Sequence, residues 1–123
     1  MTPLIAIIED DETISQMYTY KLQSSGYRTI VAYNGKDGLK ICEAQRPDLI
    51  LLDLRMPIMN GDEMLEKLRA TKWGSKMRVI VLTNISKDEA PRSLSVLNID
   101  RYIVKAHYTP QQIVEIIQEV IKR

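Results

Sequence analysis

The sequence contains no phenylalanine, and it has only one cysteine, one histidine and one tryptophan among its 123 residues. The lone Cys42 cannot form a disulfide within the chain, which fits a reducing compartment. Leu, Ile and Met must therefore fill the core. We expect Cys42 to be a small buried core residue and His107 to be a solvated loop residue.

Strong charge of one sign is also absent. The formal net charge is +1 and no run of Lys or Arg marks a basic patch, so we expect no direct nucleic-acid binding. No apolar stretch approaches the ~18 residues needed to span a bilayer, so no membrane contact is expected either. The start at Met1 lacks a basic region, which argues against a signal peptide and for a cytoplasmic location.

What the chain does contain is a series of short apolar runs without strict alternation. A length of 123 residues with 45% hydrophobic and 27% charged content suits one domain, residues 1–123. Continuous apolar runs are typical of strands buried on both faces. We expect strands at 4–8, 27–33, 48–53, 78–83 and 101–105.

The segments between these runs have helical period. In the first, an apolar stripe ends at Gly26, a left-handed cap. Asn34 caps the second helix, which directs Cys42 inward. The stripe of the first helix contains Ile14, Met17, Tyr18 and Leu22.

Three further helices are expected. Asn60 with Glu63 indicates an N-cap pair before Met64, Leu65 and Leu68. The segment 86–97 should start late or be irregular, because Pro91 removes a helix hydrogen bond. In the last helix, Thr109 precedes a proline at the first helical position, followed by an apolar stripe over 113–121.

Five alternations of strand and helix predict an α/β fold with a doubly wound parallel sheet. Such sheets bind ligands at the carboxyl ends of their strands. At those ends this chain has Glu9 and Asp10, Asp53, Thr83 and Lys105. A group of carboxylates without His or Cys ligands suits a hard cation such as Mg²⁺. The Asp53 carboxylate could attack a phosphorus atom once such a cation screens the repulsion between the carboxylate and the phosphoryl group.

These residues carry a family resemblance. The matching motifs are Ile7-Ile8-Glu9-Asp10-Asp11, Asp53-Leu54-Arg55-Met56-Pro57 with Gly61, Thr83, and Tyr102-Ile103-Val104-Lys105. In this order and spacing the chain resembles, over its whole length, the receiver domain of two-component response regulators. The resemblance implies a flavodoxin-like (βα)5 fold with five parallel strands in the order 2-1-3-4-5.

The resemblance also implies a reaction. Asp53 would take a phosphoryl group from a phosphohistidine on a sensor histidine kinase or a phosphotransfer protein. Glu9 and Asp10 would form the acid pair of a Mg²⁺ site, with Mn²⁺ as a substitute. Asp53 and the backbone carbonyl of Arg55 would complete the protein ligands. The chain would be a signalling phosphoacceptor and not an enzyme, apart from catalysing its own phosphorylation and dephosphorylation.

The same resemblance implies a switch. Thr83 and Lys105 would contact the phosphoryl group, and Tyr102 would turn inward as Thr83 moves. The face formed by segment 86–97, strand 101–105 and the last helix would then bind a different downstream protein partner. A phosphorylation-dependent homodimer is an option. We expect no attached effector domain after the last helix, and the chain would be either a stand-alone regulator or a part of a longer one.

The chain departs from the family pattern in three places. Ala106 stands where the family usually has a proline after a cis bond, so we expect a trans Lys105–Ala106 bond. Asn84 follows Thr83 where the family often has a very small residue. Arg55 and Ile85 occupy positions that tune acyl-phosphate hydrolysis in the family, and neither suits the orientation of a water. We therefore expect a long-lived phosphorylated form.

Three alternatives stay open at this point. Haloacid-dehalogenase-like phosphatases also use a strand-end Asp with Mg²⁺, but they need a second Asp where this chain has Arg55. A phosphorylation-independent interaction module would be indicated by failure to bind Mg²⁺. A flavin-binding protein is disfavoured because the acidic loop after the first strand would repel a phosphate.

Overall fold

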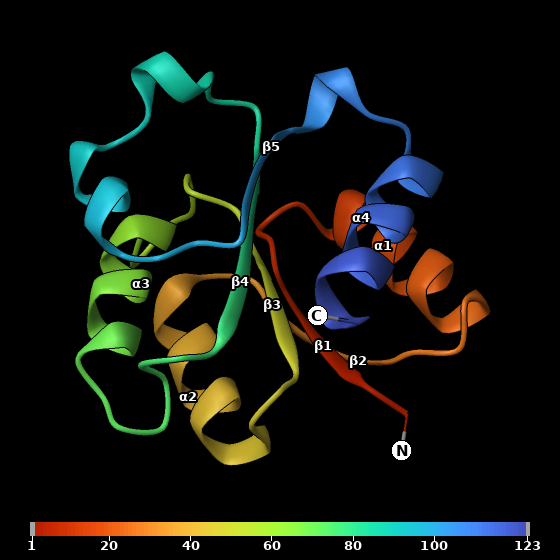
Figure 1. The fold of residues 1–123 in the computed structure, drawn as a ribbon, viewed down its shortest axis with the longest axis horizontal. Helices are drawn as coiled ribbons and strands as arrows, with labels where there is room; N and C mark the ends of the chain where they lie inside the picture. The colour runs from red at the N-terminus through yellow and green to blue at the C-terminus, as the bar shows by residue number, and fades with distance from the viewer. Residues whose placement is uncertain (1, 123) are drawn as a thin grey trace.

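The structure is a computed structural model and describes residues 2–122. Its five strands are β1 (Leu4–Ile8), β2 (Arg28–Ala32), β3 (Leu49–Leu52), β4 (Arg78–Thr83) and β5 (Arg101–Val104). All neighbouring strands are parallel and lie in the order β2-β1-β3-β4-β5, which confirms the predicted sheet (Figure 1). Each expected strand is present, with ends that differ by at most one residue.

Four α-helices cover the sheet: α1 (Glu12–Ser24), α2 (Gly35–Gln45), α3 (Gly61–Arg69) and α4 (Pro110–Lys122). Helices α1 and α4 lie together on one face, while α2 and α3 lie together on the other (Figure 1). This arrangement is the doubly wound architecture that the sequence predicts.

Each face of the sheet has its own aliphatic core. On β1, Ile5 and Ile7 pack toward α1 and α4, whereas Ala6 and Ile8 pack toward α2 and α3. Cys42 is fully buried in the second core, as expected, and burial raises the pKa of its thiol to about 12. None of the helices between residues 2 and 122 is long and apolar enough to cross a bilayer.

Two helix ends confirm the sequence interpretation. Gly26, with φ +95°, follows α1, and its N–H donates to the Gln23 carbonyl. Before α4, the Gln112 side chain accepts from the Thr109 N–H at 2.8 Å, and the Thr109 hydroxyl oxygen accepts from the Gln112 N–H at 3.1 Å. This reciprocal pair is a capping box, which satisfies two free backbone donors at the helix start.

Two expectations about side chains were wrong. The Asn60 side chain does not cap α3; its oxygen accepts instead from the Met56 N–H at 3.3 Å, within the loop before the helix. Met17 is 40% exposed on α1, and Ser15 is buried in its place. The face of α1 toward the sheet is set by the angle at which α1 packs, which apolar spacing alone does not determine.

The segment between β4 and β5 contains no α-helix. It forms two 3₁₀ helices, η1 (Lys87–Glu89) and η2 (Arg92–Val96), on either side of Pro91. The expected irregularity is confirmed, but the expected helix is replaced by short turns. Leu94 is the one buried residue of η1 and η2.

Arg69, the last residue of α3, is hydrogen-bonded to the C-terminal end of this segment. Its guanidinium donates to four backbone carbonyls, those of Gly74, Met77, Leu97 and Asn98, over distances of 2.7–2.9 Å. Burial lowers the pKa of Arg69, and the charge of Asp100 partly opposes that shift. One side chain therefore ties the loop before β4 to the loop before β5.

We predict that Arg69→Met lowers the free energy of unfolding by about 2 kcal/mol or more, because several partly buried carbonyls lose a charged donor. Urea denaturation monitored by circular dichroism measures this change. Lys67→Met, on the exposed side of the same helix, is the matched control and should change stability little. Equal effects of the two substitutions would contradict the structural role of Arg69.

Candidate functional site

The strand register brings the predicted acidic residues together. Ile8 at the end of β1 pairs with Leu52 at the end of β3, so Glu9 and Asp53 follow directly on neighbouring strands. The Asp53 N–H donates to the Ile8 carbonyl at 3.0 Å, which continues the sheet by one residue. The apolar strands thus determine where both carboxylates leave the core.

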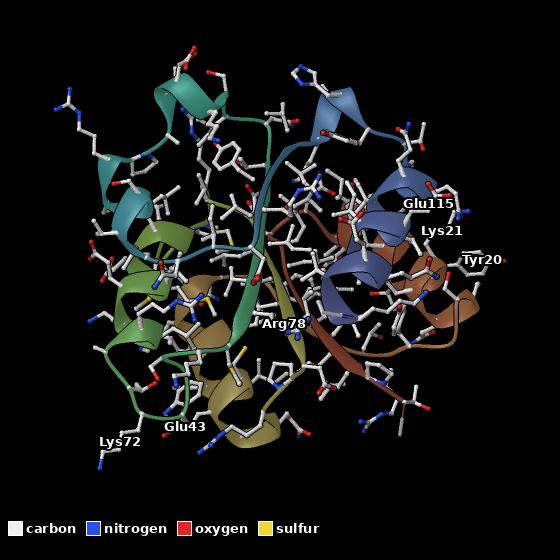
Figure 2. The ribbon with its side chains drawn as sticks, viewed as in Figure 1. Tyr20, Lys21, Glu43, Lys72, Arg78 and Glu115 are labelled. Atoms are coloured by element: carbon white, nitrogen blue, oxygen red, sulfur yellow. The ribbon has the colours of Figure 1, made fainter. Side chains whose placement is uncertain are left out.

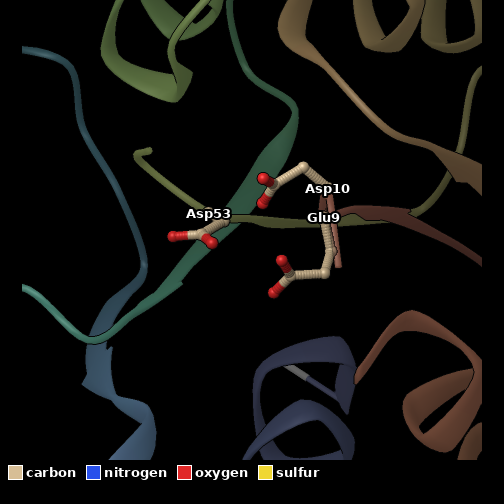
Figure 3. Close-up of side chains that lie close together, drawn as sticks. All are labelled: Glu9, Asp10 and Asp53. Carbon is tan, nitrogen blue, oxygen red and sulfur yellow. The ribbon is translucent and has the colours of Figure 1, made fainter. Parts of the chain in front are cut away.

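Glu9, Asp10 and Asp53 form one cluster at this edge. Each contributes a carboxylate oxygen, and these oxygens all lie within 4.8 Å of one another. Figure 3 shows the three carboxyl groups converging from the ends of β1 and β3. Glu9 and Asp53 are 5% and 8% exposed, whereas Asp10 is exposed, so two carboxylates of the cluster are buried and the third faces solvent.

Lys105, which follows β5, supplies the opposite charge. Its ammonium group donates to Asp53 Oδ2 at 3.2 Å and also contacts Glu9 Oε1. Burial lowers the pKa of Lys105, but the hydrogen bond to Glu9 and the charge of Asp53 outweigh this and raise it. Burial raises the pKa of Glu9, and the hydrogen bonds from Lys105 and the Asp11 N–H only partly oppose it.

This donor set fits a hard divalent cation. Three carboxylates within reach of one another, with no nitrogen or sulfur ligand among them, are the chemistry that Mg²⁺ and Mn²⁺ prefer. Two buried carboxylates face one ammonium group, and the exposed Asp10 adds a further negative charge. The cluster therefore has an excess of negative charge that a cation would balance.

A cavity of about 370 Å³ opens above Asp53. Thr83, which ends β4 and is 1% exposed, contributes to its wall. Asn84 and Ile85 line the same cavity, as the sequence predicts for residues next to the site. The cavity also has walls that the sequence did not indicate, formed by Ser86 and Glu89.

Glu89 reaches the cavity because η1 turns tightly after β4. The Ser86 hydroxyl donates to the Glu89 carboxylate at 3.3 Å, and the Glu89 N–H donates to the Ser86 carbonyl at 3.0 Å. The sequence does contain a Ser and a Glu at capping-box spacing. That signal predicts a helix start and says nothing about which residues face Asp53.

Tyr102 on β5 faces the loop that follows Thr83. Its hydroxyl donates to the Ile85 carbonyl at 2.6 Å and, at 3.4 Å, to the Ser86 carbonyl. Partial burial raises the pKa of Tyr102, and the negative charges of Asp53 and Glu89 add to that shift. Tyr102 is therefore bonded to the wall of the Asp53 cavity.

The loop between Asp53 and α3 approaches the site very closely. A Cβ atom added to Gly61 would lie 2.1 Å from the Asp53 carbonyl oxygen, so only glycine fits there. The Gly61 N–H donates to the Leu54 carbonyl at 2.9 Å. Arg55 lies in this loop; it is exposed and also lines the cavity.

The end of β5 differs as expected from a proline-containing loop. The Lys105–Ala106 bond is trans, and Lys105 begins a short 3₁₀ helix, η3 (Lys105–His107). His107 is exposed in η3, which fits a solvated loop residue. Lys105 nevertheless reaches both Glu9 and Asp53, so the altered loop does not remove it from the site.

Comparison with known proteins gives a consistent result. The sequence model of the response regulator receiver domain matches residues 5–118. The chain is 31% identical over its whole length to the alkaline phosphatase synthesis transcriptional regulatory protein PhoP of Bacillus subtilis. It is 32% identical, also over its whole length, to the DNA-binding response regulator MtrA of Mycobacterium leprae. It spans 50% and 53% of these two relatives, about half of their length.

Solved structures agree. A CheY-like response regulator receiver domain protein from Methanospirillum hungatei is 30% identical, with a TM-score of 0.88 over 99% of this chain and 95% of that one. The receiver domain of the Francisella response regulator 1452 is 27% identical, with a TM-score of 0.87 over 99% and 98% of the two chains. Both structures therefore share the fold of this chain over nearly its whole length.

We predict that Lys105→Met lowers the free energy of unfolding in Mg²⁺-free buffer by about 2 kcal/mol or more, because two buried carboxylates lose their cation. The same substitution should raise Mg²⁺ affinity, since the ion no longer competes with the ammonium group. Thermal unfolding with and without Mg²⁺, together with calorimetric titration, measures both effects.

Lys72→Met is the control, because Lys72 is exposed and projects from the end of the molecule opposite the acidic edge (Figure 2). If Mg²⁺ stabilises the Lys105 variant no more than the unaltered chain, the ammonium group and the cation do not share the site.

Proposed function

The chain belongs to the response regulator receiver domain family, and on that premise we propose that Asp53 is its phosphoacceptor. The observation that supports this assignment is the position of Asp53: it directly follows β3, it is 8% exposed, and it lines a cavity that Thr83 also lines. Phosphoacceptance in signalling is general to the family, and the residues that perform it here are the proposal.

The proposed step is a displacement at phosphorus. A carboxylate oxygen of Asp53 forms a bond to the phosphorus atom while the bond from phosphorus to the histidine nitrogen of a sensor kinase or phosphotransfer protein breaks. The electron pair of that bond remains on the histidine nitrogen. The product on this chain is an aspartyl phosphate, a mixed acid anhydride.

Three groups of the chain would assist the step. Glu9, Asp10 and Asp53, with the Arg55 carbonyl, would hold Mg²⁺. When bound, Mg²⁺ neutralises negative charge between the carboxylate and the incoming phosphoryl group. Lys105 already donates to Asp53 Oδ2 and is placed to donate to a phosphoryl oxygen, and Thr83 offers a hydroxyl in the same cavity.

We further propose that phosphorylation is transmitted through Tyr102. A separate groove of about 760 Å³ is lined by residues of η1, η2 and β5, among them Tyr102, Leu94 and Arg101. The hydroxyl of Tyr102 bonds to Ile85, which lines the Asp53 cavity. A shift of Thr83 toward a phosphoryl group would therefore change the shape of this groove. The region would then act as a two-state element whose equilibrium depends on the charge at Asp53.

The proposed output surface consists of η2, β5 and α4. Arg101 on β5 forms a solvent-accessible ion pair with Glu119 on α4 at 3.8 Å. A downstream protein or a second copy of the chain would bind here, and a phosphorylation-dependent homodimer is one form of this proposal. The absence of direct nucleic-acid binding stays a prediction, because the relatives PhoP and MtrA are named as transcriptional and DNA-binding regulators.

We predict that incubation with acetyl phosphate and Mg²⁺ adds the mass of one phosphoryl group to the intact protein. The addition should be absent with EDTA and absent in Asp53→Asn, which keeps the shape of the side chain and removes the nucleophile. Intact-mass spectrometry measures it. Modification that persists in Asp53→Asn would place the acceptor elsewhere and would contradict the assignment.

We predict a long-lived aspartyl phosphate, because neither Arg55 nor Ile85 carries a group that orients an attacking water. Arg55→Asn should shorten the lifetime by about tenfold or more, since a positioned polar group contributes at least that much to proton transfer. Decay of the modified mass after removal of acetyl phosphate measures the lifetime. Decay within seconds in the unaltered chain would refute the prediction.

A further inference from the structure

Tyr18 on α1 is buried in the core between the sheet and the helices α1 and α4, and it brings a hydroxyl group into an otherwise aliphatic cluster. Tyr18 is 4% exposed, and the other buried residues of this core are all Ile, Leu or Val. In the part of the chain that the structure describes, the Tyr18 hydroxyl forms no hydrogen bond. A tyrosine buried to this extent usually has a partner for its hydroxyl, so a partner is expected in another state of the site.

The Tyr18 side chain reaches the underside of the acidic edge. Tyr18, Glu9 and Asp53 line one small cavity of about 10 Å³, and its other walls are aliphatic residues near the ends of β1, β3 and β4. The Glu9 carboxyl group is directed toward the side of the sheet on which α1 and α4 lie (Figure 3). A cavity of this size is about as large as one water molecule, so small movements of the side chains around it change which of them are in contact.

The charges at this edge act on the Tyr18 hydroxyl. Burial raises the pKa of Tyr18, the positive charge of Lys105 lowers it by less, and the negative charge of Glu9 raises it further. Both charged groups therefore lie close enough to Tyr18 to affect its hydroxyl. The hydroxyl is thus a neighbour of the ion pair that would rearrange when Asp53 is phosphorylated.

Glu9 depends on Lys105 for its charge balance in this structure. Glu9 is 5% exposed, and it accepts from the Asp11 N–H at 3.1 Å and from the Lys105 ammonium group. The same ammonium group donates to Asp53, and in the proposed reaction it turns to the phosphoryl group there. Glu9 would then lose its charged donor while it remains buried, which is costly for a carboxylate unless another donor takes its place.

We propose that Tyr18 is a positioning residue whose hydroxyl donates to the Glu9 carboxylate when Lys105 turns to the phosphoryl group. This inference rests on the proposed function of Asp53. The new hydrogen bond offsets the loss of the ammonium group and keeps Glu9 in the orientation in which it would hold Mg²⁺. Tyr18 does not touch the phosphoryl group and acts only through Glu9. A packing role of the ring would need no hydroxyl, so Tyr18→Phe separates the two roles.

The first experiment uses beryllofluoride, a mimic of the phosphoryl group, together with Mg²⁺. Tyr18→Phe should weaken the binding of beryllofluoride by about fivefold or more, as expected for loss of one hydrogen bond to a charged group. The affinity of the variant for Mg²⁺ alone should change little, because Lys105 still bonds to Glu9 when no phosphoryl group is present. Isothermal titration calorimetry measures both affinities.

Tyr20→Phe is the matched control, because Tyr20 lies on the same helix but is 73% exposed and projects outward (Figure 2). Equal beryllofluoride affinity for Tyr18→Phe and the unaltered chain would overturn the inference. An equal loss of affinity for Mg²⁺ alone would also overturn it, because the defect would then be a general one of the site. If the unaltered chain binds no beryllofluoride, the proposed function itself fails and this inference fails with it.

The second experiment needs neither Mg²⁺ nor a phosphoryl group. In Lys105→Met the ammonium group is permanently absent, so the Tyr18 hydroxyl should already donate to Glu9. Tyr18→Phe should therefore lower Tm by about 3 °C or more in the Lys105→Met background, and by much less in the unaltered chain.

Thermal unfolding of the four proteins in EDTA measures this coupling between Tyr18 and Lys105. Equal losses of Tm in the two backgrounds would assign Tyr18 to packing alone and would overturn the inference. The beryllofluoride titration decides the proposal by itself if Lys105→Met does not fold.

Discussion

The functional edge depends on one ammonium group. Glu9 and Asp53 are both buried, and their oxygens lie within 4.8 Å of each other, so without Lys105 they would be neighbouring like charges with little solvent to separate them. Lys105 is bonded to both carboxylates from the end of a different strand. Lys105 offsets part of the negative charge of the two buried carboxylates, and the charge that remains at this edge suits a hard cation.

The main features of this edge could be predicted from the sequence because strand burial and chain order determine them. Short apolar runs predicted β1, β3, β4 and β5, and the residues after them had to lie together at one edge of a parallel sheet. The local rules for caps also succeeded at Gly26 and at Thr109. In each case the decisive interaction joins residues that are near in sequence or are placed by a regular hydrogen-bond pattern.

The remaining features depend on packing between distant segments. Glu89 reaches the Asp53 cavity only because η1 forms instead of an α-helix, and the burial of Ser15 in place of Met17 follows from the angle of α1 on the sheet. The positive φ of Ile58 likewise cannot be predicted from the residue type, because isoleucine disfavours positive φ. The roles proposed for the site residues rest on the family resemblance and on the geometry of the acidic edge.

The burial of Cys42 has a practical consequence for spectroscopy. It is the one cysteine in the chain, it is fully buried, and burial raises the pKa of its thiol to about 12, so the thiol is protonated at neutral pH. A thiolate is the reactive form of cysteine, so maleimide and iodoacetamide reagents have almost nothing to attack in the folded protein. Fluorophores or spin labels can therefore be attached to single introduced cysteines, on η2 or α4 for example, without first replacing the native residue.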